Sequence, residues 1–381
     1  MSFFIGISGG HHRSQAIALR DTQVVATAVG ESLQSHIYGF DTLVERTRLL
    51  LSNVAADTGH SDVDDLVRDT RRVTISLPGV TDERPLDHLA SVNWRTPDCL
   101  QVVDDTCAGL IGGALDRTGI CAIAGTGASV CIGLGEFPFP LGKSRKLDGF
   151  GAILGDWGSG FRLATRYLEE YGRHYDRFGN PELIPLFHEL LAAQPNIKHV
   201  DGLQNWFDVL RRTHPQDWPV HFAEVAAVVT SAAEREKPDP FAVDLVRQSA
   251  RELARTIQIG LTRAERVLRK KEKTDLKVES LKVVCLGGQF LHSKVYFQEV
   301  KKAVAETHPA NEVILAKFTP VVGAVLMAYA EDRILPPPEC TAKIGNSILA
   351  HPAAVQHGIA VPHAPVPSLL ASAGKTPPDA P

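Results

Sequence analysis

Two glycine-containing turns are the parts of this chain best suited to hold phosphate. The first, Gly9-Gly10-His11-His12-Arg13-Ser14, follows the apolar run at 3–8, and the second, Gly125-Thr126-Gly127, follows the apolar run at 120–124. In a P-loop or Rossmann site the glycine turn leads into a helix whose N-terminus binds the phosphate. Here both turns lead into another β-rich segment. The pattern therefore predicts two phosphate-binding β-hairpins, one near the start of each half of a duplicated architecture.

The elements that position these turns follow from short apolar runs and helical periodicity. Asp239-Pro240 is typical of a helix start, with an N-cap and a proline at the first helical position, and a long amphipathic pattern follows it. Strands are predicted at 3–8, 15–20, 23–30, 73–79, 100–105, 120–124, 130–133 and 281–286. Helices are predicted at 40–57, at 106–117, across most of 161–272 and from Pro320 onward.

Composition excludes several classes of protein. The 381 residues are 44% hydrophobic and carry a formal net charge of −4, which disfavours nucleic acid or an anionic membrane as the main partner. No leader or membrane-spanning stretch is evident, so the expected location is cytoplasmic. The six cysteines have no metal-ligand spacing and are interpreted as reduced core thiols.

We expect two domains and a tail. The N-terminal domain is predicted over 1–117, and the second over 118–335 with a helical insertion at about 161–272. The final helix of the second domain is expected to pack back on the first. Residues 336–381 are rich in Pro, Ala, Ser and His without periodicity, which predicts a flexible extension.

Taken together, the motifs resemble the BadF/BadG/BcrA/BcrD ATPase family, and within it the N-acetylglucosamine kinases of the actin/hexokinase superfamily. The resemblance spans about 3–332 and is most specific at Gly155-Asp156-Trp157-Gly158-Ser159-Gly160, downstream of the second glycine turn. It implies an α/β fold of two duplicated actin-like ATPase (ribonuclease H-like) domains with a cleft between them. ATP with Mg²⁺ would bind in that cleft beside a sugar, and the family implies a homodimer.

Asp105 in Asp105-Thr106-Cys107-Ala108 aligns with the catalytic base of this family. A carboxylate at the end of a strand can accept the proton of a sugar hydroxyl as it attacks the γ-phosphate. The structural alternative is that Asp105 is the N-cap of the 106–117 helix. We favour the catalytic interpretation, because Asp105 lies one short helix before the second glycine turn.

The resemblance implies roles for the other motif residues. The turn residues would contact the ATP phosphates, with Thr126 also near the sugar, and the Gly287-Gly288 pair would lie against the adenosine. Simple β-turn geometry is the alternative for the second turn, and a turn aspartate is the alternative for Asp156. The phosphate set is Gly9, Gly10, His12, Arg13, Ser14, Gly125, Thr126 and Gly127, and the sugar set is Gln34, Thr126, Gly149, Phe150 and Asp156. No protein side chain is predicted to bind a metal.

The first turn departs from the family pattern, which has an acid, three glycines and a threonine where this chain has Ser8, Gly9, Gly10, His11 and His12. The acid normally helps to hold magnesium, so its loss removes a negative charge beside the phosphates. The histidines can supply N–H donors or positive charge to phosphate, or can simply be exposed on the turn. Gln34 stands where the family has an asparagine, which leaves the identity of the sugar open.

The function predicted from these residues is an ATP-dependent kinase acting on a hydroxyl of an amino sugar, most like an N-acetylglucosamine kinase. One alternative is a non-catalytic sensor of sugar or nucleotide that lost turnover through Ser8, His11 and His12. Another is an ATPase that activates a reductase or dehydratase through a cluster at a dimer interface. That role needs cysteines beside the nucleotide hairpins, and Cys121 and Cys131 flank the second one.

Overall fold

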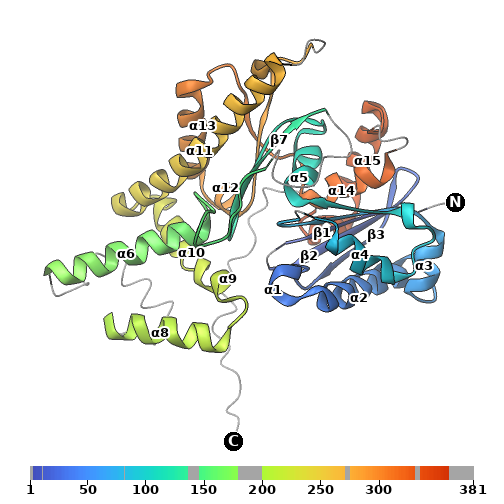
Figure 1. Ribbon diagram of the computed structural model, residues 1–381, viewed down its shortest axis with the longest axis horizontal. Helices are drawn as coiled ribbons and strands as arrows, with labels where there is room; N and C mark the ends of the chain where they lie inside the picture. Colours follow the sequence, from blue (N-terminus) through green and yellow to red (C-terminus); the bar gives the residue numbers. More distant parts are fainter. Residues whose placement is uncertain are drawn as a thin grey trace, which may run out of the picture.

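Two five-stranded mixed sheets form the frame of the molecule (Figure 1). The structure, a computed structural model, describes residues 3–10, 12–80, 82–135, 146–178, 200–270, 275–330 and 335–359. In the first sheet the strand order is β3-β2-β1-β4-β5, with β1, β2 and β3 antiparallel and β4 and β5 parallel to β1. These strands are β1 Phe3–Gly9, β2 Ser14–Arg20, β3 Gln23–Gly30, β4 Thr70–Leu77 and β5 Leu100–Asp104.

The second sheet repeats this topology. Its order is β10-β9-β6-β7-β8, in which β6, β7 and β8 are antiparallel and β9 and β10 run parallel to β6. The strands are β6 Thr118–Ala124, β7 Ala128–Leu134, β8 Lys146–Asp148, β9 Val283–Leu286 and β10 Val313–Leu315. In both sheets a glycine turn joins the central strand to its antiparallel neighbour. The predicted duplicated α/β architecture is therefore confirmed.

Two small-residue helices are exchanged between the sheets. Helix α5 (Asp105–Ala114) follows the first sheet in the chain but packs on β6, β7 and β9 of the second. Helix α14 (Pro320–Tyr329) follows the second sheet but packs on β1 and β4 of the first. The two helices also contact each other, and their apolar side chains join one core cluster with residues of both sheets.

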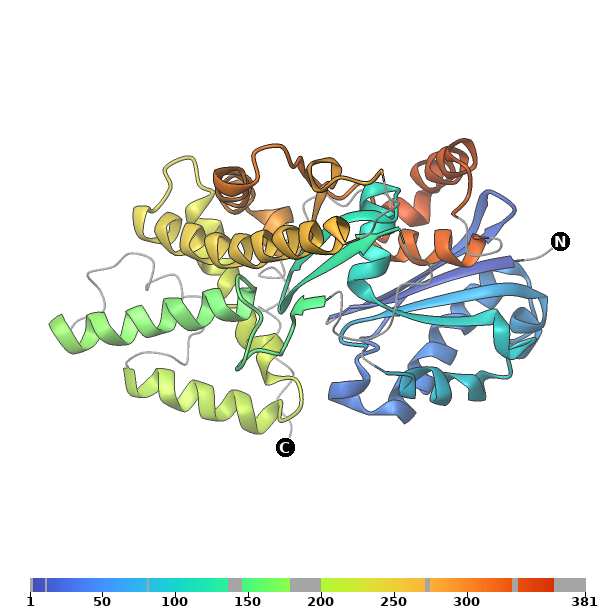
Figure 2. The same cartoon turned by 45° about the horizontal axis from the view of Figure 1, so that its top comes forward.

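Some of the remaining helices pack on the two sheets, whereas α6, α8, α9 and α10 pack on α11 and on one another. Helix α2 packs on β2 and β3, and α11 packs on β6 and β7 with α13 beside it (Figures 1 and 2). Asp239 caps α11 through hydrogen bonds from the N–H groups of Phe241 and Ala242, as predicted. The first half contains α1 Ser35–Tyr38, α2 Phe40–Thr58, α3 Val63–Asp69 and α4 Arg84–Leu89. The second contains α6 Gly160–Phe178, α8 Val200–Thr213, α9 Trp218–Ala223, α10 Ala226–Ala233, α11 Pro240–Arg269, α12 Gly288–His292 and α13 Lys294–Thr307.

The expected flexible extension beyond 335 is wrong for its described part. Residues 338–356 form α15 (Pro338–Ala350) and α16 (Pro352–Gln356), which pack against β3. Ile344 and Ile348 are fully buried, and the His357 carbonyl accepts a 2.7 Å hydrogen bond from Gln15. Each of these helices starts with proline, and their apolar residues are widely spaced. The segment therefore has the composition of a low-complexity sequence although it is helical. The prediction for 360–381 lies outside the described residues.

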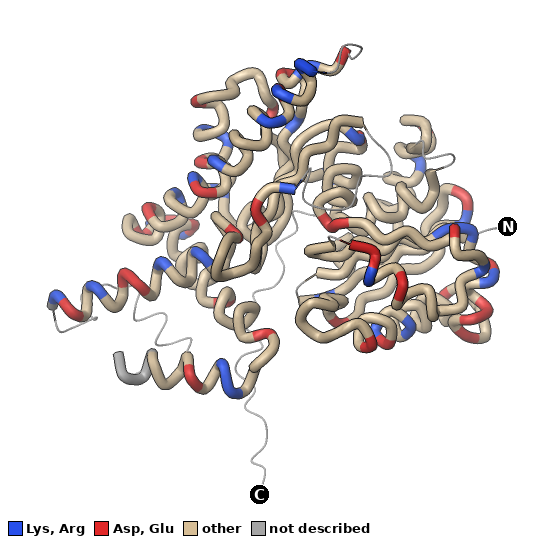
Figure 3. The backbone as a smooth tube through the Cα atoms, in the orientation of Figure 1, with Lys and Arg blue, Asp and Glu red and all other residues tan. Residues whose placement is uncertain are grey.

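Charged residues of both signs are interspersed over the described parts of both halves (Figure 3). Among the described helices, none is both long enough and apolar enough to cross a membrane.

Candidate functional site

The two predicted phosphate hairpins meet. His12, in the turn between β1 and β2, lies with its Nε2 atom 3.1 Å from Oγ1 of Thr126, in the turn between β6 and β7. Within the first turn, the Gly10 N–H donates a 2.9 Å hydrogen bond to the Arg13 carbonyl. The neighbouring His11 lies outside the described residues. The contact between His12 and Thr126 joins the first sheet to the second at the glycine turns.

The second turn is fixed by the start of α6. The N–H groups of Gly160 and Phe161 donate to the carbonyls of Gly125 and Thr126 at 2.8 and 3.1 Å. A Cβ atom on Gly127 would lie 2.7 Å from a carboxylate oxygen of Asp156, so a larger residue here would have to displace that carboxylate. A Cβ on Gly125, in contrast, would meet nothing within 4 Å. The first residues of α6 therefore hold the turn through its carbonyl groups, while the space beside the Gly125 Cα is open.

The surroundings of His12 favour its neutral form. Desolvation lowers its pKa, the charges of His221 and Arg13 lower it further, and Glu224 opposes them. A neutral imidazole can donate or accept one hydrogen bond at Nε2 but brings no positive charge. Of the two functional interpretations of this histidine, a hydrogen-bonding role therefore fits better than an electrostatic one.

Arg13 and Ser14 face different surroundings from His12. The Arg13 guanidinium lies beside Gly358, since a Cβ there would be 3.3 Å from its Nη2 atom. Ser14 is 1% exposed, and its hydroxyl has no hydrogen-bond partner among the described residues. The resemblance implies that both side chains contact phosphate, and in the structure Arg13 also lies next to the C-terminal segment.

Asp104 and Asp105, two adjacent carboxylates at the end of β5, have different surroundings. Asp104 is the N-cap of α5: its Oδ1 accepts a 3.1 Å hydrogen bond from the Thr106 N–H and another from the Thr106 hydroxyl. Its Oδ2 accepts a 2.7 Å hydrogen bond from Nζ of Lys146, which belongs to β8 of the other sheet. The capping alternative proposed for Asp105 is therefore fulfilled by its neighbour. Asp105 itself is half-buried, and its Oδ1 atom has no hydrogen-bond partner among the described residues.

The carboxyl of Asp105 is poised to exchange a proton near neutral pH. Burial and the Asp104 charge raise its pKa to about 7, and Lys146 opposes this shift. Burial disfavours the charged form of Lys146, but the Asp104 and Asp105 carboxylates outweigh it and raise the pKa of the lysine. A base whose pKa lies near the working pH combines adequate basicity with a substantial deprotonated fraction. Asp105 could therefore act as a general base, with the Lys146 cation held close by through its hydrogen bond to Asp104.

The 148–157 loop is tied to the second hairpin by two aspartates. Asp148 accepts hydrogen bonds from the N–H groups of Asp156 and Trp157 at 2.8 and 2.7 Å. Burial and the Asp148 charge raise the pKa of Asp156 to about 6, while the Ala128 N–H in β7 is among the donors that lower it. Asp156 has a φ of 57°, in the left-handed region that aspartate tolerates better than most residues. The turn-aspartate alternative thus has direct structural support, alongside the predicted sugar contact.

Gly149 and Phe150 begin this loop. Gly149 has a φ of 70°, and a Cβ there would lie 2.9 Å from the Lys146 side chain. Phe150 is 53% exposed. The positive φ therefore favours glycine at this position, and the aromatic ring beside it lies at the surface.

Gln34 is buried next to the first hairpin with both amide atoms unsatisfied. Its side chain is 1% exposed, and neither Oε1 nor Nε2 has a hydrogen-bond partner among the described residues. The Ser32 hydroxyl connects it to the turn, since it donates to the Gly10 carbonyl at 2.9 Å and lies 3.4 Å from the Gln34 N–H. A buried amide without partners costs about 1–3 kcal/mol. Such a group is suited to bind a polar ligand.

The predicted adenosine pair has a packing role. Gly287 has a φ of 99°, and a Cβ there would lie 2.4 Å from the carbonyl oxygen of Ala124, the residue before the second glycine turn. Gly288 starts α12 and is less crowded, because its nearest neighbour would be His292 at 3.7 Å. Close approach of β9 to β6 is therefore sufficient to explain Gly287.

Sequence reasoning missed Lys146, and it missed Asp148 as a loop anchor. Only the pairing of β8 with β7, in which Lys146 lies opposite Cys131, brings the lysine to the carboxylates. The available signal was the alternation of Lys146, Leu147 and Asp148 directly before Gly149, which is typical of a strand with one charged face.

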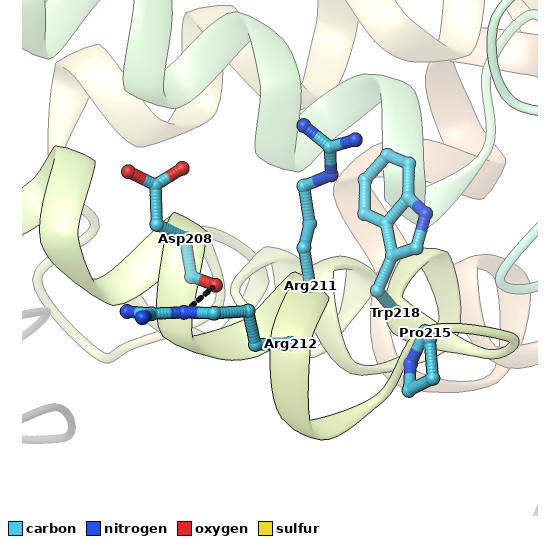
Figure 4. A pocket seen from close by; sticks show the side chains of 5 residues that line it. All are labelled: Asp208, Arg211, Arg212, Pro215 and Trp218. Atoms are coloured by element: carbon cyan, nitrogen blue, oxygen red, sulfur yellow. Dashed lines mark hydrogen bonds between the residues drawn. The ribbon is translucent and has the colours of Figure 1, made fainter.

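A separate hollow of about 580 Å³ lies on α8 and the segment that follows it (Figure 4). It is lined by Asp208, Arg211, Arg212, Pro215 and Trp218, and Arg212 Nε donates to the Asp208 carbonyl at 3.2 Å. None of the residues predicted to bind ligand lines it. The cysteines beside the second hairpin, Cys121 and Cys131, are at most 2% exposed.

The paired sheets and exchanged helices define an α/β protein with the two-part architecture of actin-like ATPases. The chain belongs to the BadF/BadG/BcrA/BcrD ATPase family, whose model matches residues 5–328. It is 25% identical to the N-acetylmuramic acid/N-acetylglucosamine kinase of Clostridium acetobutylicum over 60% of this chain and 67% of that one. It is 24% identical to the N-acetyl-D-glucosamine kinase of Dictyostelium discoideum over 85% and 97%.

A solved structure supports the fold. A protein of Chromobacterium violaceum, provisionally named an N-acetylglucosamine kinase, aligns with a TM-score of 0.62 at 20% identity and covers 86% of this chain and 99% of its own. At that identity the match establishes the architecture alone.

Proposed function

We propose that this protein is an ATP-dependent sugar kinase that phosphorylates a hydroxyl of an amino sugar, with N-acetylglucosamine as the first substrate to test. The observation that carries the proposal is the meeting of the two glycine hairpins, one from each sheet, at His12 and Thr126. The names of the two curated relatives add support for an amino sugar as the acceptor.

Asp105 is the proposed general base. Its carboxyl would accept the proton of the sugar hydroxyl as that oxygen attacks the γ-phosphorus and the bond to the β,γ-bridging oxygen of ATP breaks. Asp104 already caps α5 and binds Lys146, so Asp105 retains an unengaged oxygen for this task. Lys146 would hold Asp104 in place, and its charge would stabilise the deprotonated form of Asp105.

Gln34 and Asp156 are the proposed sugar contacts. The buried amide of Gln34 offers both a donor and an acceptor, which matches a vicinal hydroxyl or an acetamido group. Asp156, with a pKa of about 6, offers a carboxylate next to the second hairpin. A site whose buried polar groups are satisfied only by the right sugar rejects analogues that lack the matching group.

The nucleotide is expected to lie along the two hairpins, with Gly9, Gly10, Gly125 and Gly127 beside its phosphates. The open side of Gly125 provides room for this approach. Mg²⁺ would arrive with ATP, and when bound it would neutralise phosphate charge. Position 8 is a serine, and the carboxylate that lies against the second hairpin is that of Asp156.

The test is direct detection of sugar phosphate. The protein is incubated with ATP, Mg²⁺ and, separately, N-acetylglucosamine, glucosamine, N-acetylmannosamine, N-acetylmuramic acid and glucose, and products are identified by mass spectrometry. We expect a phosphorylated amino sugar with wild type and none with Asp105→Ala. Absence of product from every sugar, in protein that binds ATP, would reject the kinase.

One observation favours a second candidate, a non-catalytic sensor of sugar or nucleotide. The Thr126 hydroxyl, predicted to contact the γ-phosphate or the sugar, is bonded to His12. The variant His12→Thr, which restores the family's residue, separates the two. A sensor silenced by His12 would gain turnover, whereas a working kinase would keep a similar or lower rate.

A further inference from the structure

Three potential metal ligands cluster beside α9, on the second half of the molecule. His214, Asp217 and His221 each place a nitrogen or oxygen atom within 4.8 Å of the others. Nδ1 of His214 lies 3.6 Å from Oδ1 of Asp217, and Nε2 of His221 lies 3.5 Å from Oδ2 of the same carboxylate. These residues belong neither to the predicted phosphate set nor to the predicted sugar set.

The spacing is close to that of ligands around one ion, because both histidine nitrogens face the same carboxylate. Two ligand atoms of a tetrahedral zinc site, each about 2.1 Å from the metal, lie about 3.4 Å apart. The local backbone explains how three residues so close in sequence converge. His214 follows the end of α8, Asp217 precedes the start of α9, and His221 lies one helical turn later at i+4 from Asp217.

An outer shell of the kind found around bound metals is also in place. Glu224 Oε1 lies 3.4 Å from Nδ1 of His221, the ring nitrogen opposite the one that faces Asp217. The Tyr38 hydroxyl donates a 3.0 Å hydrogen bond to Oδ2 of Asp217. A carboxylate on the far nitrogen of a ligand histidine fixes its tautomer, and a hydrogen bond to a ligand carboxylate fixes its orientation.

We propose that His214 Nδ1, the Asp217 carboxylate and His221 Nε2 bind a divalent transition metal ion of the zinc class. Two imidazoles and one carboxylate suit Zn²⁺, Co²⁺ or Ni²⁺ rather than Mg²⁺, which prefers oxygen ligands. With three protein ligands, one position remains for water or a ligand atom from solution. The His214 and His221 side chains are 41% and 32% exposed, so an ion can reach them from solvent. Pro215 and Trp218, from the same segment, line the hollow shown in Figure 4.

The site also connects the two halves. Tyr38 ends α1 in the first half, and Asp217 starts α9 in the second (Figures 1 and 2). An ion bound to the Asp217 carboxylate would therefore fix the acceptor of the hydrogen bond from Tyr38, which links the two halves of the chain. The proposal does not depend on kinase activity.

Isothermal titration of tag-free protein, stripped with chelator and then titrated with Zn²⁺, Co²⁺ and Mg²⁺, tests the site. We expect one Zn²⁺ or Co²⁺ per chain, a rise in unfolding temperature on addition of Zn²⁺, and no comparable binding of Mg²⁺. The double variant His214→Gln/His221→Gln should lose this binding. Tyr38→Phe should keep the stoichiometry but weaken affinity about 10-fold.

The matched control replaces two histidines outside the cluster, as His88→Gln/His308→Gln, and should bind zinc like wild type. Circular dichroism verifies that each variant is folded, which is expected because the replaced ligands are partly exposed. Wild-type protein that takes up no zinc would overturn the proposal. Equal binding by the His214→Gln/His221→Gln variant would place the ion elsewhere and overturn it too.

Discussion

At the scale of single residues, Asp104 and Asp105 have different roles: Asp104 caps α5 and binds Lys146, and Asp105 keeps an oxygen that can accept a proton. The sequence predicted an acidic end to β5 and left open whether Asp105 caps the following helix. Hydrogen bonds from Thr106 and Lys146 assign the structural tasks to Asp104. The local sequence could not reveal this, because the partner lysine comes from the other sheet and either aspartate suits an N-cap.

Asp105→Asn should stabilise the folded protein at pH 8. The pKa of Asp105 is about 7 in the folded state and about 4 in an unfolded chain, so the folded state loses stability as pH rises through that window. Asparagine stays neutral and avoids this loss. We expect a gain of about 1–3 kcal/mol at pH 8, which disappears near pH 4. Urea unfolding at both pH values measures it, and an equal difference at both would contradict the raised pKa.

The same carboxyl should shape the pH dependence of turnover. If Asp105 acts as base, only its deprotonated form is active, so kcat/KM should fall about tenfold per pH unit below about 7. Steady-state rates measured over a pH series at fixed ionic strength check this. A flat profile down to about pH 5.5 would mean that Asp105 is not the base.

At the scale of elements, the exchange of α5 and α14 is the contact on which the two halves depend. A Cβ on Gly323 of α14 would lie 1.8 Å from the carbonyl oxygen of Ala108 in α5. Strand and helix positions, including the helix at 106–117, could be predicted from short apolar runs and periodicity. The sheet on which each helix packs could not be predicted, because that packing depends on contacts between segments far apart in the sequence.

Gly323→Ala should therefore destabilise the protein, by about 3 kcal/mol, because two helix backbones must separate. The matched control is Gly172→Ala in α6, where a Cβ would meet nothing within 4 Å. There the loss of backbone entropy in the unfolded state should make alanine stabilising by about 0.5–1 kcal/mol. Thermal unfolding of both variants gives the comparison, and equal effects would contradict the described packing of α5 and α14.

The C-terminal helices offer a second test of element packing. Ile348 in α15 is fully buried, whereas its neighbour Leu349 is 51% exposed. Ile348→Ala should cost about 2–5 kcal/mol, and Leu349→Ala less than about 0.5. Denaturant midpoints distinguish this from a loose extension, for which both substitutions would be neutral.

At the scale of the whole molecule, the duplicated topology was predictable because each half repeats one pattern of strand, glycine turn and strand. The contacts that bring the halves together were not: His12 with Thr126, Lys146 with Asp104, and Tyr38 with Asp217. Each pair is separated by at least 42 positions, and no local pattern indicates its partner. These three contacts place the candidate catalytic group, the phosphate hairpins and the proposed metal cluster along the junction of the two halves.

The central claim is that this junction transfers phosphate from ATP to an amino sugar with Asp105 as base. The most direct measurement is ADP release at pH 8 with and without N-acetylglucosamine, for wild type and Asp105→Asn, with ATP binding measured for both. We expect sugar-dependent release by wild type, a decrease of about 10²–10⁴-fold in the variant and similar ATP affinity. Release that is independent of sugar, or equal in the variant, would contradict it.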